Sequence, residues 1–107
     1  MVNNQKICGM LGIATKAGKI VAGTEACIQE IEKHNVKLLI LAADAADRTK
    51  NTFKEKCKEY NVNVYENLTI DEISNSIGKA NKAVIGIKDK GFSQAIKKLI
   101  NGGEMIG

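Results

Sequence analysis

The sequence contains no proline and no tryptophan, and aromatic residues make up only 4% of its 107 residues. One histidine and three widely spaced cysteines, with no Cys-x-x-Cys pair, are too few for a typical zinc site or a disulfide framework. The longest apolar run, Leu38 to Ala43, is far shorter than the roughly 20 residues that span a bilayer. No basic-then-apolar leader opens the sequence. We therefore expect neither export nor a membrane partner, but a cytoplasmic protein.

What is present is the composition of an ordinary globular protein. Hydrophobic residues make up 44% and charged residues 26%, enough to bury a core. The length is typical of one domain, so we expect a single domain over residues 1–107. Lysine and arginine number 16 against 12 acidic residues, which gives a net charge of +4. This excess permits a nucleic acid partner without requiring one.

Hydrophobic periodicity divides the chain into alternating helices and strands. Helices are predicted over residues 4–16, 23–34, 47–60 and 69–78, followed by a closing helix that carries Phe92 and Leu99 and ends before Gly102. Strands are predicted over residues 19–22, 36–43, 62–65 and 83–87. Asp47 is expected to cap the third helix, and Thr69 with Glu72 forms a capping box for the fourth. The alternation predicts an α/β fold, a three-layer α-β-α sandwich with a small four-stranded mixed sheet.

Motifs that would indicate catalysis are weak. The segment from Gly12 to Ile20 superficially resembles a phosphate-binding P-loop, but five residues instead of four separate its glycines and Ile20 replaces the required hydroxyl. Its second glycine also ends a predicted helix, whereas a P-loop begins one. The three cysteines fall on apolar helix faces, as buried structural thiols do. Acidic pairs occur only where turns and helix caps explain them. We expect no enzyme and no cofactor.

The lysines are unevenly distributed. Residues 1–24 contain three lysines and no acid, and residues 76–103 contain six lysines and one acid, Asp89. In an alternating layout, Gly23-Thr24 and the loop over residues 78–82 can lie at the same end of the sheet. A helix N-terminus there would offer free amides beside Lys79 and Lys82. This combination suits a nucleic acid backbone.

Five segments, in this order and at this spacing, resemble a known family: LGIATKAGKIVAGTEA (Leu11–Ala26), KLLILAADAADRTK (Lys37–Lys50), KCKEYNVNV (Lys56–Val64), EISNSIGKANKAVIGI (Glu72–Ile87) and DKGF (Asp89–Phe92). The chain is similar over nearly its whole length to the kink-turn-binding ribosomal proteins of the L-seven-Ae/L-thirty-e superfamily, and most closely to its small bacterial YlxQ-like branch. That family's fold is a compact α-β-α sandwich. The resemblance implies RNA binding without catalysis, through the start of the second helix and the loop before the last strand.

The family's signature places Gly-Thr, then Asn-Glu, then Lys one turn on. Gly23 and Thr24 match it, whereas Glu25 stands at the Asn position, Ala26 at the Glu position and Gln29 at the Lys position. Glu25 can accept hydrogen bonds from a guanine edge and Gln29 can donate one, but Ala26 supplies neither. We therefore expect the protein to bind RNA, but to prefer a kink-turn over other RNAs less strongly than the family's signature would allow.

The expected partner is structured RNA, either ribosomal RNA or a kink-turn-like bent helix, bound by a monomer. The RNA-binding residues are expected to be Gly23 and Thr24 through helix-end amides, Glu25 and Gln29 facing bases, Gly78 and Asn81 in the second loop, and Lys16, Lys19, Lys79 and Lys82 on phosphates. Glu25 as a first-turn carboxylate that favours the helix dipole, and Gln29 as plain helix surface, stay open. Two other functions also stay open. One is an adaptor for ribosomal or translation proteins, and the other is an enzyme with a deep pocket at the strand ends.

Overall fold

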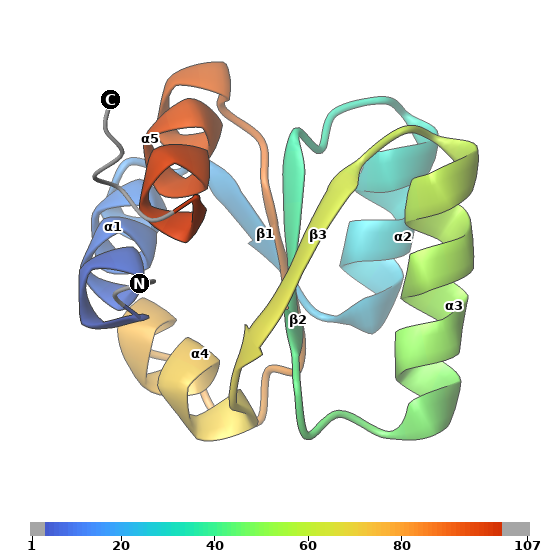
Figure 1. Cartoon of the computed structure of the whole chain (residues 1–107), viewed down its shortest axis with the longest axis horizontal. Helices are drawn as coiled ribbons and strands as arrows, with labels where there is room; N and C mark the ends of the chain where they lie inside the picture. The colour runs from blue at the N-terminus through green and yellow to red at the C-terminus, as the bar shows by residue number, and fades with distance from the viewer. Residues whose placement is uncertain (1–3, 102–107) are drawn as a thin grey trace.

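The computed structural model describes residues 4–101 as alternating helices and strands (Figure 1). In chain order they are α1 (Asn4–Lys16), β1 (Ile20–Ala22), α2 (Thr24–Glu32), β2 (Leu38–Ala42), α3 (Asp47–Glu59), β3 (Asn63–Leu68), α4 (Ile70–Ile77), β4 (Val84–Ile87) and α5 (Lys90–Ile100). The predicted element order is therefore confirmed. Gly102, where the closing helix was expected to have ended, lies outside the described residues.

The four strands form one mixed sheet in the order β1-β4-β2-β3. Strand β4 is antiparallel to both β1 and β2, whereas β2 and β3 are parallel. A parallel pair needs a crossover connection, and α3 supplies it. Every residue of the central strands β2 and β4 is buried. This burial on both faces explains why residues 36–43 are almost continuously apolar.

Helices cover both faces of the sheet. Helices α1, α4 and α5 pack together on one face, and α2 and α3 pack together on the other (Figure 1). The three-layer α-β-α sandwich is therefore confirmed. The layer of α1 and α4 is tight at Gly12, where an added Cβ would lie 3.1 Å from the carbonyl oxygen of Ser76.

Short-range signals end several elements where the sequence predicts. Gly18 follows α1 with φ 71°, and Gly78 ends α4 in the left-handed conformation with φ 72°. At the start of α4, Thr69 Oγ1 accepts a hydrogen bond from Glu72 N at 3.1 Å, and Glu72 Oε1 accepts one from Thr69 N at 2.9 Å. The predicted capping box is therefore confirmed.

Two local predictions are wrong. Asp47 does not cap α3, because Ala46 is the N-cap residue and makes no side-chain capping bond. Asp47 is instead the first helical residue, where its charge favours the helix dipole. Strand β3 extends to Leu68, three residues beyond the prediction, because Leu68 pairs with Ala42 of the buried strand β2. For β3, a neighbour distant in sequence thus outweighs the local pattern.

Asp44 also acts over a long range. Its Oδ1 accepts a hydrogen bond from Ile70 N at 2.8 Å, so it caps the start of α4 rather than its own turn. Nearby, Ala43 N donates a hydrogen bond to the carbonyl oxygen of Leu68 at 2.7 Å and so connects the end of β2 to the end of β3. The ends of β2 and β3 and the start of α4 thus lie together at one end of the sheet.

Candidate nucleic-acid interface

The start of α2 and the loop before β4 are neighbours. Gly23 directly follows β1, and its N–H donates to the carbonyl oxygen of Val84 at 3.0 Å. On the other side of β4, Ala42 N donates to the carbonyl oxygen of Ala83 at 2.8 Å. The ends of β1 and β2 therefore meet the beginning of β4 at one end of the sheet, as the sequence led us to expect (Figure 1).

Lys82 lies over the first turn of α2. Its Nζ is 3.7 Å from the position that a Cβ would occupy at Gly23. Gly23 is the N-cap residue of α2, with φ 100° and ψ 157° and no side-chain capping bond. Only glycine adopts this backbone conformation readily. The first-turn amides of α2 and a lysine ammonium are thus offered side by side to an acceptor from outside.

Ser74 of α4 holds the loop that carries Lys82. Its Oγ accepts a hydrogen bond from Lys82 N at 2.9 Å, and its carbonyl oxygen accepts one from Lys79 N at 3.0 Å. Ser74 is only 6% exposed. Sequence reasoning did not single out Ser74, although a small polar residue inside the apolar stripe of α4 was a usable signal. Through these two hydrogen bonds, Ser74 fixes the backbone at Lys79 and Lys82.

The rest of this loop is open to solvent. Gly78, Lys79 and Asn81 are exposed, and Lys82 is half-buried. Asn81 has φ 53°, a left-handed conformation that asparagine tolerates better than most residues. We refer to Gly23, Thr24 and residues 78–82 together as the loop rim.

On α2, Thr24, Glu25 and Gln29 are all exposed, whereas Ala26 is partly covered. Glu25 and Gln29 are four residues apart, so they occupy neighbouring positions on one face of the helix. The structure therefore places these polar side chains next to the loop rim.

Two lysines of the predicted site lie elsewhere. Lys19 precedes β1, whereas Gly23 follows it, and Lys88 N donates to the carbonyl oxygen of Lys19 at 2.8 Å. Lys19 is therefore at the opposite end of the sheet, separated from the loop rim by the length of β1, about 10 Å. Lys16 lines a groove of about 370 Å³ between α1 and α4, and Gly78 lines the same groove. Lys16 thus lies near the second loop but not in it.

The loop-rim lysines keep their charge available. Within residues 4–101, no carboxylate lies within 4.0 Å of the ammonium of Lys79 or Lys82. Other lysines are paired: Lys33 and Lys88 with Glu30, Lys50 and Lys54 with Glu66, and Lys56 with Glu32. The ion pairs of the described residues therefore lie away from the loop rim, and Lys79 and Lys82 keep unpaired ammonium groups there.

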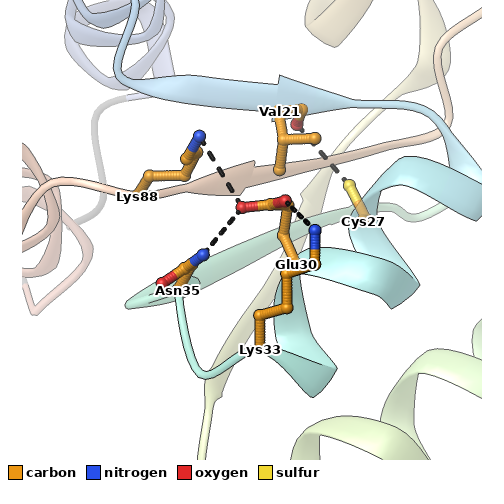
Figure 2. Close-up of polar contacts among 6 residues, drawn as sticks. All are labelled: Val21, Cys27, Glu30, Lys33, Asn35 and Lys88. Atoms are coloured by element: carbon orange, nitrogen blue, oxygen red, sulfur yellow. Dashed lines mark hydrogen bonds and ion pairs between the residues drawn. The ribbon is translucent and has the colours of Figure 1, made fainter.

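The buried cysteines lack nucleophilic character. Burial raises the pKa of Cys27 to about 12, and its Sγ lies 3.5 Å from the carbonyl oxygen of Val21 (Figure 2). Burial likewise raises the pKa of Cys57 to about 11. Only thiolates are strong nucleophiles, so both side chains act as structural thiols at neutral pH.

Over the described part of the chain, no cluster of three or more His, Cys, Asp or Glu residues could hold a metal ion. In the same residues, no helix has the length and apolar character needed to cross a membrane. His34, the single histidine, packs against Tyr60 with ring centroids 5.2 Å apart. These observations leave the loop rim as the strongest candidate site.

Fold and site together define a class of protein: a small α-β-α sandwich that presents a basic loop beside an uncapped helix N-terminus. The chain belongs to the Ribosomal protein L7Ae/L30e/S12e/Gadd45 family, whose model matches residues 5–97. A relative from Enterococcus faecium, RNA-binding protein YlxQ, is 39% identical over 100 residues, which cover 94% of this chain and 96% of that protein. The RNA-binding protein YlxQ of Bacillus subtilis (strain 168) is 32% identical over 92 residues, covering 86% and 92% respectively. The resemblance seen in the sequence is therefore confirmed.

Solved structures share the fold. A protein of unknown function from Bacillus halodurans C superposes with a TM-score of 0.86 at 33% identity, covering 90% of this chain and 97% of that one. The Giardia lamblia 15.5kD RNA binding protein superposes with a TM-score of 0.77 at 13% identity, covering 92% and 84%. The second likeness concerns the fold alone. Both confirm the predicted fold class.

Proposed function

We propose that this protein binds structured RNA through the loop rim, without catalysis. The observation that carries the proposal is the position of Lys82 Nζ, 3.7 Å from the Cβ position of Gly23 at the uncapped start of α2. A phosphate group accepts hydrogen bonds from helix-end amides and pairs with a lysine, so one phosphate satisfies both features. Two relatives that carry the name RNA-binding protein support the same class of partner.

Each part of the surface has a role in this proposal. Thr24 contributes its amide to a phosphate or sugar edge, and Lys79 and Lys82 neutralise phosphates. Gly23 was expected to contribute an amide as well, but its N–H bonds to the carbonyl oxygen of Val84, so its role is the backbone conformation that starts α2. Glu25 and Gln29 face bases from α2, and Asn81 reads a base from the loop. Lys16 contacts the backbone of the RNA where it passes Gly78. Lys19 has no part in this surface, because β1 separates it from the loop rim.

We further propose that the RNA is ribosomal RNA or a kink-turn-like bent helix, bound in the cytoplasm by a monomer in the service of translation. The RNA is tested by titrating the protein with a kink-turn, an unbent duplex of equal length and a ribosomal RNA fragment. We expect the kink-turn or the ribosomal fragment to bind more tightly than the duplex. The two loops of the loop rim form an irregular surface, which suits a bent RNA better than a straight duplex. Equal affinity for all three would contradict this choice of RNA.

The lysines are tested through salt dependence. Replacing both Lys79→Ala and Lys82→Ala should flatten the log–log slope of affinity against salt by about one unit for each lysine. The double variant Lys97→Ala with Lys98→Ala removes the same charge from the last turn of α5 and serves as the matched control. An unchanged slope in the first variant would exclude both loop lysines from the interface.

The placement of α2 is tested by a gain of function. A variant with Ala26→Glu and Gln29→Lys restores the side-chain chemistry of the family's signature at these positions. We expect its affinity for a kink-turn to rise relative to an unbent duplex, since one good base contact contributes about 1 to 3 kcal/mol of discrimination. No gain would show that α2 does not dock in this orientation.

An adaptor that binds a protein instead of RNA is the alternative function. The observation in its favour is Ile13, which lines the groove between α1 and α4 and is 56% exposed, the one large exposed hydrophobic side chain among residues 4–101. A purified protein without absorbance at 260 nm that ignores folded RNA would favour the adaptor. Copurifying nucleic acid and salt-dependent RNA binding would favour the loop-rim proposal.

A further inference from the structure

Three lysines that the proposed function does not use lie side by side at the other end of the sheet. Lys19 precedes β1, Lys37 precedes β2 and Lys88 follows β4. Lys88 N donates to the carbonyl oxygen of Lys19 at 2.8 Å, and Lys37 N donates to the carbonyl oxygen of Ile87 at 2.7 Å. Because β4 lies between β1 and β2, the three residues form one row. We refer to Lys19, Lys37 and Lys88 as the lysine edge.

Strand register sets the spacing of this row. Ile87 pairs with Ile20 on one side and with Leu38 on the other. Lys19 and Lys88, one residue further out, are therefore directly opposite one another. Lys37 lies beside them less regularly, because its N–H bonds to the carbonyl oxygen of Ile87, the residue that already pairs with Leu38. Neighbouring strands lie about 5 Å apart, so the backbone of the row is about 10 Å long, and the pleat directs the side chains of Lys19 and Lys88 to one face. Lys88 reaches Glu30 of α2, which identifies that face as the one covered by α2 (Figure 2).

The positive charge of this row is only partly balanced. Like charges directly opposite one another on neighbouring strands are unfavourable. Glu30 lies 3.6 Å from Lys88 Nζ and 3.8 Å from Lys33 Nζ, and it accepts a hydrogen bond from Asn35 at 3.1 Å. The hydrogen bond from Asn35, followed by the charges of Lys88 and Lys33, lowers the pKa of Glu30. One carboxylate is thus shared between two lysines.

Lys19 and Lys37 have no such partner. Both are exposed, and over residues 4–101 no carboxylate lies within 4.0 Å of either ammonium. The nearby acid Asp89 is engaged elsewhere, because its Oδ2 accepts the hydrogen bond of Phe92 N and caps α5. The lysine edge therefore keeps a net positive charge that a polyanion can neutralise.

We propose that the lysine edge is a second phosphate-binding surface, which holds one segment of RNA backbone while the loop rim holds another. This inference rests on the proposed function. The lysine edge presents ammonium groups at strand ends, and its carboxylate and amide, Glu30 and Asn35, bond to each other while Glu30 also pairs with lysines, so the edge binds phosphates without reading bases. The two surfaces lie at opposite ends of β1. The protein would therefore bridge two backbone segments of one folded RNA.

The test uses two variants that change the charge of the lysine edge in opposite directions. Lys19→Ala with Lys37→Ala removes two unpaired cations, and Glu30→Gln removes the shared carboxylate while leaving an oxygen to accept the hydrogen bond from Asn35. Lys97→Ala with Lys98→Ala is again the control of equal charge. Each protein is titrated over a range of salt with a two-armed structured RNA, and with a truncated RNA that covers the loop rim alone.

On the two-armed RNA, the Lys19 and Lys37 variant should flatten the log–log salt slope by about two units, and the Glu30 variant should steepen it by up to about one unit. On the truncated RNA, both variants should match the wild type.

Other outcomes would overturn the inference. A Lys19 and Lys37 variant that behaves like the Lys97 and Lys98 control on the two-armed RNA would show that the row is only solvated surface. Equal effects on both RNAs would show that the row belongs to a single site. In either case the proposed function still stands if the Lys79 and Lys82 variant has a flatter log–log salt slope than the wild type. If the slope of that variant is unchanged, the proposed function itself fails. Changes of the same sign in the Lys19 and Lys37 variant and the Glu30 variant would also contradict the inference, because charge alone predicts opposite signs.

Discussion

The two ends of the sheet are both basic, but they are built differently. At the loop rim, Lys79 and Lys82 project from an irregular loop held by Ser74, beside helix amides that no side chain caps. At the lysine edge, Lys19 and Lys88 are fixed by strand register, and Glu30 supplies a shared counter-charge to Lys88. Shape and hydrogen-bonding groups make the loop rim suited to recognising a particular RNA fold. The lysine edge is suited to contacting any phosphate backbone.

This difference shows that net charge alone does not locate a binding site. The lysines differ in what surrounds them: free amides, a shared carboxylate, or a full ion pair. The surroundings decide whether an anion replaces water or competes with an existing partner.

The largest expected effect follows from substituting Gly23→Val at the loop rim. Valine is strained at φ 100° and ψ 157°, so the free energy of unfolding should fall by about 2 to 3 kcal/mol. Urea denaturation measures this loss, and RNA affinity should fall with it, because the first turn of α2 must shift. As a control, Gly9→Ala lies in open space in the middle of α1 and should raise stability by about 0.5 to 1 kcal/mol. A neutral Gly23→Val variant would contradict the strained conformation.

The two buried thiols, one near each end of the sheet, should make the stability of the protein depend on pH in the alkaline range. Cys27 lies under the loop rim, with Sγ 3.9 Å from the carbonyl oxygen of Val84, and Cys57 lies near the end of α3, where Val62 N binds its carbonyl oxygen. Their pKa values of about 12 and about 11 exceed the ordinary value of 9.0. The unfolded chain therefore loses these protons before the folded protein does. Stability should fall above pH 9, by about 1 kcal/mol for each thiol and pH unit, until the folded-state pKa is reached.

Urea denaturation between pH 8 and about pH 10 measures this slope. A Cys27→Ala variant should lose its share of the slope and leave the share of Cys57 intact. A slope that is the same in the variant and the wild type would show that Cys27 ionises equally in both states. The contribution from each end of the sheet can then be separated.

A smaller effect is expected for Ser74→Ala. The variant leaves Lys82 N without its hydrogen-bond partner, so stability should fall by about 1 kcal/mol. RNA affinity should fall severalfold, because the loop no longer holds Lys82 in place. Ser76→Ala is the matched control, since the Ser76 hydroxyl donates to the carbonyl oxygen of Glu72 within the same helix. An equal loss of affinity in both variants would mean that α4 as a whole matters, rather than the contact with the loop.

The smallest effect is expected for Lys54→Ala, which lies at neither end. Lys54 pairs with Glu66 at 3.1 Å on the outer side of α3 and β3, and it is half exposed. Such pairs contribute little, so stability should change by less than about 0.5 kcal/mol. The salt slope of RNA binding should stay at its wild-type value. If the salt slope of the Lys54→Ala variant flattened as much as that of the Lys79 and Lys82 variant, the distinction between paired and unpaired lysines would be wrong.

Short-range patterns were sufficient to predict much of this fold. The buried strands β2 and β4 follow from their continuous apolar residues. Thr69 with Glu72, and Gly78, mark the two ends of α4 through hydrogen bonds and φ angles that involve only a few neighbouring residues. The burial of Cys27 and Cys57 follows from their places on apolar helix faces. Each of these features depends on residues within about one or two helical turns.

The long-range contacts could not be read in the same way. Asp44 caps a helix 26 residues away, and Ser74 orders Lys82 across eight residues of helix end and loop. Lys19, expected beside Gly23, lies at the other end of the sheet beside Lys88. Strand order and direction put these residues where they are, because the antiparallel β4 lies between β1 and β2 and so sets which loops share an end. Hydrophobic periodicity tells which residues are buried. It does not encode which strands become neighbours, and in this protein that pairing placed the lysines.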